Sequence, residues 1–202
     1  MKFVKKIPLT DSQLSKELMS LGWSKIKEPK NLMMTILLSV PIMFLNGIIS
    51  ILIMVPFDNP FASILANHSF TFSLKILDIL LFITVVFLFL LVHELIHAVL
   101  IPNFTKSNKI FWGITINGGF VSTTEKVGKG RFVLISIAPL FLLSIVLPII
   151  LGVFNLINGL IMFLIIFNAM GSSVDILNLI LILFQTRGKH YIINNGFETY
   201  VK

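Results

Sequence analysis

The sequence contains no cysteine among its 202 residues. This absence excludes disulfide bonds, zinc sites built on thiolates and a cysteine nucleophile. Charged residues are also scarce: they make up 12% of the chain, whereas soluble domains average about 25%. Hydrophobic residues make up 56%. With so little polar surface to face water, we expect one compact unit that is largely solvated by lipid.

The basic residues do not indicate a nucleic-acid partner, although the net charge is +7. Lysine and arginine flank the apolar runs and do not gather on one face, which is the pattern of membrane anchors and topology signals. Residues 1–30 are polar and lysine-rich, and the first apolar run begins too late for a signal peptide. We therefore expect residues 1–30 to form a cytoplasmic segment.

Four apolar segments are long enough to cross a bilayer, which takes about 20 helical residues. The second includes His93, Glu94 and His97, because without them its uninterrupted part is too short. Residues 132–174 form one uncharged run of 43 residues, too long for a single crossing, and a break at Gly152–Gly159 divides it. The expected spans are about 32–56, 77–101, 132–151 and 160–184.

Loop charges predict the orientation of these spans. Seven lysines precede the first span and five lysines or arginines occupy residues 102–131, whereas residues 58–73 and 152–159 contain none. The positive-inside rule then places both termini, including the tail 185–202, and the central loop in the cytoplasm. We expect a multi-pass protein of the cell membrane whose residues 1–202 form a single domain.

The central loop has a hairpin pattern. Lys109–Ile116 and Gly119–Thr124 are rich in β-branched and aromatic residues, and Asn117-Gly118 between them is a strong turn signal. This hairpin either joins two helices at the surface or takes part in function, and both remain open. The expected fold class is thus all-α integral membrane: four transmembrane helices with a small cytoplasmic β-hairpin between the second and third.

Residues His93–His97 read H-E-L-I-H, an H-E-x-x-H pattern. On a helix, residues four apart share a face, so His93 and His97 can bind one metal ion. Zinc suits imidazole ligands, and a catalytic zinc has three protein ligands and one open position. Glu94 can take a proton from water and return it to a leaving amine. In the alternative interpretation, these residues only reach from a helix end toward lipid headgroups.

Asp175 is the best candidate for a third ligand. It lies in the fourth span, about 14 Å from the cytoplasmic end, while His93 and His97 lie about 12 and 6 Å from theirs. Its alternative role is a buried carboxyl bonded to a neighbouring helix. Less suitable residues are too distant, on the opposite side or in flexible segments: Asp58, His68, Asp78, Glu125 and His190.

Asn168 falls seven residues before Asp175 and shares its helix face. Its amide can orient a substrate carbonyl, hold a ligand in place, or simply bond two helices together. The sequence favours none of these roles over the others.

Taken together, these segments resemble a known family. The helix LLVHELIHAVL, the hairpin, Ala138-Pro139-Leu140, Asn168 with GSSVDIL and the closing HYIINNGFETYV are similar to a bacterial membrane family of zincin peptidases, over about Ile79–Val201. In plan the chain also resembles site-2 proteases, although Ile176 follows Asp175 where that pattern has glycine. The resemblance implies that His93, His97 and Asp175 are zinc ligands and that Glu94 is the catalytic acid and base.

The predicted function is a zinc-dependent intramembrane endopeptidase that acts near the cytoplasmic face. Its substrate would be a membrane-embedded or membrane-adjacent protein segment, opened into an extended form because a helix hides its carbonyl groups. The alternative is a non-catalytic metal-binding membrane protein that acts as a scaffold or partner. A purely structural zinc site would not need Glu94 beside its first ligand.

Overall fold

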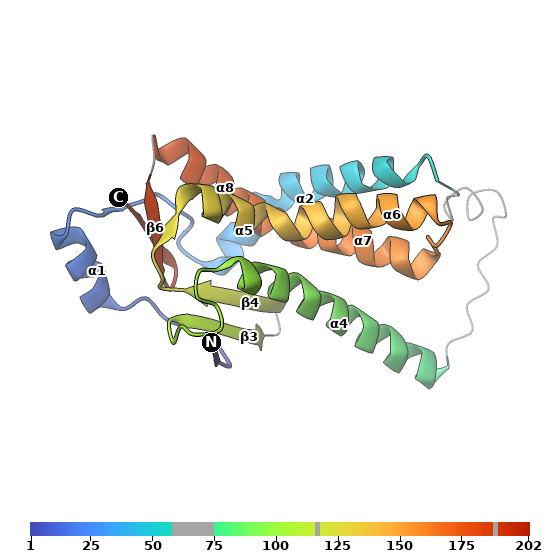
Figure 1. Ribbon diagram of the computed structural model, residues 1–202, viewed down its shortest axis with the longest axis horizontal. Coiled ribbons are helices and arrows are strands. Elements are labelled where there is room, and N and C mark those ends of the chain that lie inside the picture. Colours follow the sequence, from blue (N-terminus) through green and yellow to red (C-terminus); the bar gives the residue numbers. More distant parts are fainter. Residues whose placement is uncertain (58–74, 116–117, 188–189) are drawn as a thin grey trace.

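Four long apolar helices dominate the computed structural model, which describes residues 1–57, 75–115, 118–187 and 190–202 (Figure 1). Each is long and apolar enough to cross a membrane, and together they overlap the four ranges expected from the sequence. They are α2 (Leu32–Met54), α4 (Ile76–Leu100), the continuous run α5 (Lys129–Phe141), η1 (Leu142–Val146) and α6 (Leu147–Val153), and the pair α7 (Gly159–Gly171) and α8 (Ser173–Gln185).

Small and polar residues join α2 to α7 and α8. Asn46 Nδ2 donates to the Ala169 carbonyl (3.1 Å), and the Ser173 hydroxyl donates to Ser39 Oγ (3.3 Å). A Cβ at Gly47 would meet the Met170 side chain at 3.3 Å, so the two helices approach closely there. Without water to satisfy polar groups, such contacts hold helices together in lipid. They fix the position of α8, which carries Asp175.

The strands and a short helix gather at one end of the long helices, and both termini lie there (Figure 1). One sheet has the strand order β1-β3-β4, from β1 (Lys2–Phe3), β3 (Ile110–Thr115) and β4 (Gly118–Thr123). The other has the order β2-β7-β6-β5, from β2 (Ser24–Lys25), β5 (Val127–Gly128), β6 (Tyr191–Asn195) and β7 (Glu198–Val201). A short helix, α1 (Ser12–Ser20), packs against the second sheet through Leu18 and Tyr200.

The expected hairpin is present as β3 and β4, which pair antiparallel from Ile110↔Thr123 to Thr115↔Gly118. Alternating β-branched and aromatic residues favour this extended structure. Asn117 of the predicted turn lies outside the described residues, as do residues 58–73, whose lack of positive charge entered the orientation argument.

A second hairpin, formed by β6 and β7, was not predicted. Gly196 adopts φ 62° at its turn, and a Cβ there would lie 2.5 Å from the Thr10 nitrogen. Asn195 binds the same segment, since its Nδ2 donates to the Asp11 carbonyl (2.7 Å) and its Oδ1 accepts from the Asp11 N–H (3.0 Å). Residues 1–30 are therefore bound to the C-terminal hairpin and are more than a polar tail.

The all-α class needs correction, because the described residues contain two sheets as well as the four long helices. The hydropathy pattern revealed the helices, which are local structures. Strands of two residues such as β1, β2 and β5 carry no periodic signal of their own. They form because a partner strand from a distant part of the chain supplies the hydrogen bonds.

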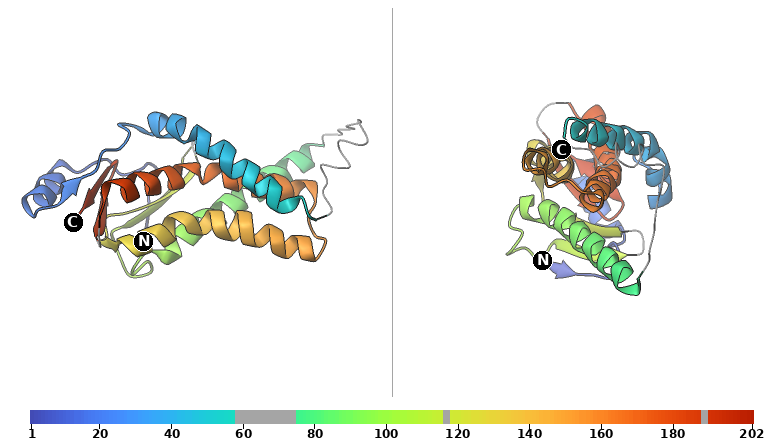
Figure 2. Two further views of the ribbon diagram at one scale, coloured as in Figure 1. Left: turned by 90° about the horizontal axis from the view of Figure 1, so that it is seen from above. Right: turned by 90° about the vertical axis from the view of Figure 1, so that its right-hand side faces the viewer.

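The second sheet meets the helices at the C-terminal end of α8. Ile26, Ile182 and Ile192 form a buried cluster with Phe132, which joins the second sheet to α5 and α8. Figure 1 and the left view of Figure 2 show the sheets at one end of the helical bundle, and Figure 1 shows the far end of α4 leaning away from the other helices. His93, His97 and Asp175 lie between these sheets and the long helices.

Candidate metal centre

Helix α4 presents two imidazole rings to the interior of the protein. His93 and His97 are one helical turn apart and each is 8% exposed. Their Nε2 atoms lie 3.2 Å from each other. The i, i+4 spacing in the sequence predicts this shared face.

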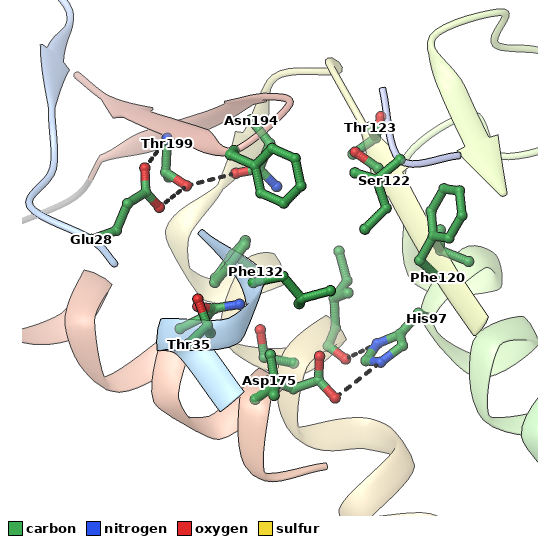
Figure 3. Close-up of a pocket in the computed structure, with 18 of the residues that line it drawn as sticks. Glu28, Thr35, His97, Phe120, Ser122, Thr123, Phe132, Asp175, Asn194 and Thr199 are labelled. Atoms are coloured by element: carbon green, nitrogen blue, oxygen red, sulfur yellow. Dashed lines mark hydrogen bonds and ion pairs between the residues drawn. The ribbon is translucent and has the colours of Figure 1, made fainter. Parts of the chain in front are cut away.

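Asp175, in the first turn of α8, brings a carboxylate to the same point. Its Oδ2 lies 3.6 Å from His93 Nε2 and 3.5 Å from His97 Nε2, and Figure 3 shows it directed at the His97 ring. The three side chains form the one group of potential metal ligands found among the described residues. Because the sequence placed Asp175 at a similar depth to the two histidines, this meeting was expected.

The spacing of these three atoms suits zinc. In a tetrahedral site with bonds of about 2.0–2.1 Å, two ligand atoms are separated by about 3.3 Å. The observed separations of 3.2, 3.5 and 3.6 Å are close to that value.

Pro139 explains how the His97 ring is held. His97 Nδ1 lies 2.9 Å from the Ile135 carbonyl oxygen in α5. Ile135 is four residues before Pro139, and proline has no N–H to form the usual helical bond to that carbonyl. The carbonyl is therefore free to accept the Nδ1–H of His97, which places the lone pair of the ring on Nε2.

Asn168 holds the other ring. Its Oδ1 lies 2.8 Å from His93 Nδ1, while its Nδ2 donates to Ser144 Oγ (2.8 Å) and the Pro139 carbonyl (3.2 Å). These two acceptors fix the orientation of the amide, so Oδ1 must accept the Nδ1–H of His93. Ser144 belongs to the π-helix η1, a local widening that is frequent at functional sites.

All polar atoms of the Asn168 side chain are thus engaged within the protein, and the residue is 3% exposed. Of the roles considered from the sequence, this geometry fits two: Asn168 holds a candidate ligand in place, and it bonds α7 to α4, α5 and η1. It leaves no amide group for the substrate-orienting role.

The donor set indicates a cation. Both histidines carry their protons on Nδ1, so two Nε2 lone pairs and a carboxylate oxygen face one another within 3.6 Å. Such groups repel each other unless a positive charge lies between them. The residues present therefore fit a zinc ion held by His93, His97 and Asp175.

Glu94 lies beside the first ligand and lines the cavity that contains the three ligands. The backbone of β4 packs against it: a Cβ at Gly119 would lie 2.6 Å from Glu94 Cγ and 2.9 Å from Oε1. Only glycine leaves space for this approach. Gly119 therefore positions the carboxylate against the first sheet.

The cavity is about 400 Å³ in volume, within the usual range for a ligand site. Figure 3 shows its walls, with Phe120, Ser122 and Thr123 of β4 on one side and Glu28 on the other. Helices α2, α4, α5 and α8 and both hairpins contribute lining residues. The metal ligands are at the membrane-helix end of this space, and the C-terminal hairpin covers the other.

The remaining candidate ligands do not reach this group. Asp78 is in the first turn of α4, about four helical turns from His93. Glu125 accepts a hydrogen bond from the Ser107 hydroxyl (2.5 Å), and the backbone carbonyl of His190 binds Lys129. Asp58 and His68 are outside the described residues.

Sequence reasoning missed several residues of the site. The lining by Glu28, Asn194 and Thr199 depends on the unpredicted second sheet. The role of Pro139 did have a signal, because a proline inside an apolar helix always frees a carbonyl four residues earlier. Which side chain uses that carbonyl depends on how α4 and α5 pack.

An H-E-x-x-H helix that meets a carboxylate from a later membrane-type helix has the residues expected of a zincin-type metal site in a membrane protein. The chain matches the family described as "Putative zincin peptidase" over residues 86–191, which is just over half of its length, and it belongs to that family. The match includes all three candidate ligands and Glu94. Comparison with curated proteins and with solved structures finds no match.

We predict that the purified protein binds one zinc ion per chain. His93→Ala or His97→Ala should abolish binding and Asp175→Ala should weaken it strongly, because two imidazoles alone make a weak site. Metal analysis after dialysis measures the stoichiometry, with His190→Ala as a control that keeps zinc. Stoichiometric zinc in the His93→Ala/His97→Ala double variant would place the metal elsewhere.

Pro139→Ala should weaken zinc binding while stabilising the metal-free protein. Alanine restores an N–H that competes with His97 for the Ile135 carbonyl, and partners of this kind contribute about 10–100-fold to metal affinity. Removing a proline from a helix interior also relieves a cost of about 3 kcal/mol.

Chelator competition and thermal unfolding measure the two effects of Pro139→Ala. Pro41→Ala in α2 is the matched control, because the carbonyl freed there serves no candidate ligand. Unchanged zinc affinity in Pro139→Ala, at equal or higher stability, would contradict the role given to Ile135.

Proposed function

We propose that the protein is a zinc-dependent endopeptidase that hydrolyses peptide bonds of membrane-embedded or membrane-adjacent proteins near the cytoplasmic face. The observation that carries this proposal is the cluster of His93, His97 and Asp175 at the wall of a cavity, with Glu94 beside it. A ligand set closed on all sides would suit a structural metal. Here the set faces a space large enough for a peptide segment.

The residues of the chain divide the chemistry between them. Bound zinc would supply Lewis acidity toward a carbonyl oxygen and toward water. The Glu94 carboxylate accepts a proton from the attacking water and delivers it to the leaving amine. Gly119 holds Glu94 in place on one side, and the bonds from Ile135 and Asn168 hold the two imidazoles on the other.

Strand β4 supports binding of the substrate in an extended form. It is an edge strand, since within the described part of the chain β3 is its single partner in the sheet. Five consecutive residues of β4 line the cavity, Gly119–Thr123, and Gly119 is in contact with Glu94. A peptide that adds to this edge would pass Glu94 with its backbone exposed, which a helical substrate cannot do.

Charge and the position of the termini support the proposed membrane orientation. Both sheets and both termini lie at one end of the helices, and the lysine-rich segments 1–30 and 102–131 belong to that end (Figure 1). The positive-inside rule makes this the cytoplasmic end. The cavity, which both hairpins line, would then open toward the cytoplasm.

Glu94→Gln should lower peptide cleavage by about 10²–10⁴-fold without loss of zinc, because glutamine keeps the size of the side chain but cannot carry the proton. A purified transmembrane test substrate and parallel metal analysis measure both properties. Asp78→Asn replaces a carboxyl at the far end of the same helix and should change neither. Full cleavage by the Glu94→Gln protein would contradict the role of Glu94 as the proton carrier.

Single cysteines test the orientation, and the sequence has none of its own to interfere. In intact cells an impermeant thiol reagent should label Leu156→Cys, in the turn between α6 and α7, and should leave Lys126→Cys unlabelled. Both positions are exposed, so accessibility in the folded protein is not limiting. Labelling of Lys126→Cys alone would invert the topology and move the cavity to the opposite face.

A further inference from the structure

The charge inside the cavity is opposite to that of the chain. The protein has 16 lysines and arginines against 9 acidic residues, yet among the described residues none of the basic ones lines the cavity. Its acidic lining residues are Glu28, Glu94 and Asp175. A zinc ion would offset the charge of Asp175, and Glu94 has the proposed role of proton carrier. Glu28 is left as an acidic group with no part in either.

Glu28 is held in a fixed position on the cavity wall. It lies just before α2, and its Oε1 accepts the Thr199 N–H (2.6 Å) while its Oε2 accepts the Thr199 hydroxyl (3.0 Å). Figure 3 shows it across the cavity from Ser122 and Thr123 of the edge strand. A peptide added to β4 would therefore have Glu28 on its opposite side.

No lysine or arginine of the described residues forms an ion pair with Glu28. The nearby Lys25 is bound to Glu198 at 2.5 Å. Burial raises the pKa of Glu28, and the two bonds from Thr199 only partly oppose this effect. The Glu28 carboxylate is partly shielded from water and has no ion-pair partner among the described residues. A bound cation would offset the cost of this desolvation.

We propose that Glu28 binds a lysine or arginine side chain of the substrate, so that the enzyme selects membrane segments with a basic flank. This inference rests on the proposed function. The cytoplasmic flanks of membrane helices are rich in lysine and arginine, and a cavity that opens to the cytoplasm would meet them. The carboxylate is an acceptor that recognises such a group through charge-assisted hydrogen bonds.

A purely structural role for Glu28 makes a different prediction. As a link between the segment before α2 and strand β7, it would affect folding and zinc content but would not distinguish one substrate from another. Selectivity for charge therefore separates the two roles.

The test compares one transmembrane substrate in versions that carry a single lysine, glutamine or glutamate at successive positions on both sides of the cleaved bond. At one position, wild-type protein should cleave the lysine version about tenfold faster than the glutamine version, judged by kcat/KM, and the glutamate version more slowly still. Equal rates for the three at every position overturn the proposal. This comparison needs no variant, so it decides even where a substitution at Glu28 disturbs the fold.

Glu28→Gln then assigns the effect to its residue. Glutamine can still accept from the Thr199 N–H, so the protein should keep its zinc, and the ratio of kcat/KM for the lysine and glutamine substrates should fall to about one. Glu28→Asp, which keeps the charge, should retain part of the preference. A preference for lysine that persists unchanged in folded, zinc-containing Glu28→Gln protein overturns the assignment.

Binding separates failure of this inference from failure of the proposed function. Zinc-loaded Glu94→Gln protein should bind the lysine peptide about tenfold more tightly than the glutamine peptide, and addition of Glu28→Gln should remove the difference. A protein that shows this binding without cleaving any substrate would retain the Glu28 subsite but not the peptidase. A protein that cleaves without charge preference would retain the peptidase alone.

Discussion

The candidate metal site depends on two hydrogen bonds, one from the Nδ1–H group of each histidine. His93 donates to Asn168 and His97 donates to the Ile135 carbonyl, and both acceptors are fixed in position by the protein. Ile135 can accept because Pro139 frees its carbonyl, and Asn168 can accept because Ser144 and Pro139 use its amide hydrogens. The consequence is that both Nε2 lone pairs face Asp175. Without these two bonds the rings could turn or change tautomer, and the three ligand atoms would no longer define one position for a cation.

The same network explains how the membrane-type helices tolerate so much polarity. A polar or charged group inside a bilayer is costly unless it has partners. Here α4, α5, η1, α7 and α8 each contribute a member, so the polar groups satisfy one another and at the same time tie the helices together. Strand β4 and the C-terminal hairpin line the part of the cavity that lies beyond the ends of these helices. The candidate metal ligands and the packing of the helices are therefore parts of one arrangement.

Local patterns predicted the parts of the structure that depend on local geometry. The helical period was enough to bring His93 and His97 to one face, and hydropathy was enough to outline the four long helices. The distances of Asp175, His93 and His97 from the cytoplasmic ends of their predicted spans also indicated that the three residues lie at a similar depth. This comparison works because all spans cross the same bilayer. The site residues that were not predicted depend on contacts between distant parts of the sequence. Thr199 of β7 holds Glu28 at the cavity wall by hydrogen bonds. The Ile135 carbonyl becomes a partner of His97 only because α5 packs against α4. The all-α class failed for the same reason, since two-residue strands exist only with their partners.

The central claim is that His93, His97 and Asp175 are the protein ligands of a single zinc ion. X-ray absorption at the zinc edge, on purified protein loaded with one equivalent of the metal, tests this claim most directly. We expect a first shell of nitrogen and oxygen at about 2.0–2.1 Å, with the outer-shell signature of two imidazole rings. A shell of oxygen atoms alone, or the signature of one ring, would contradict it.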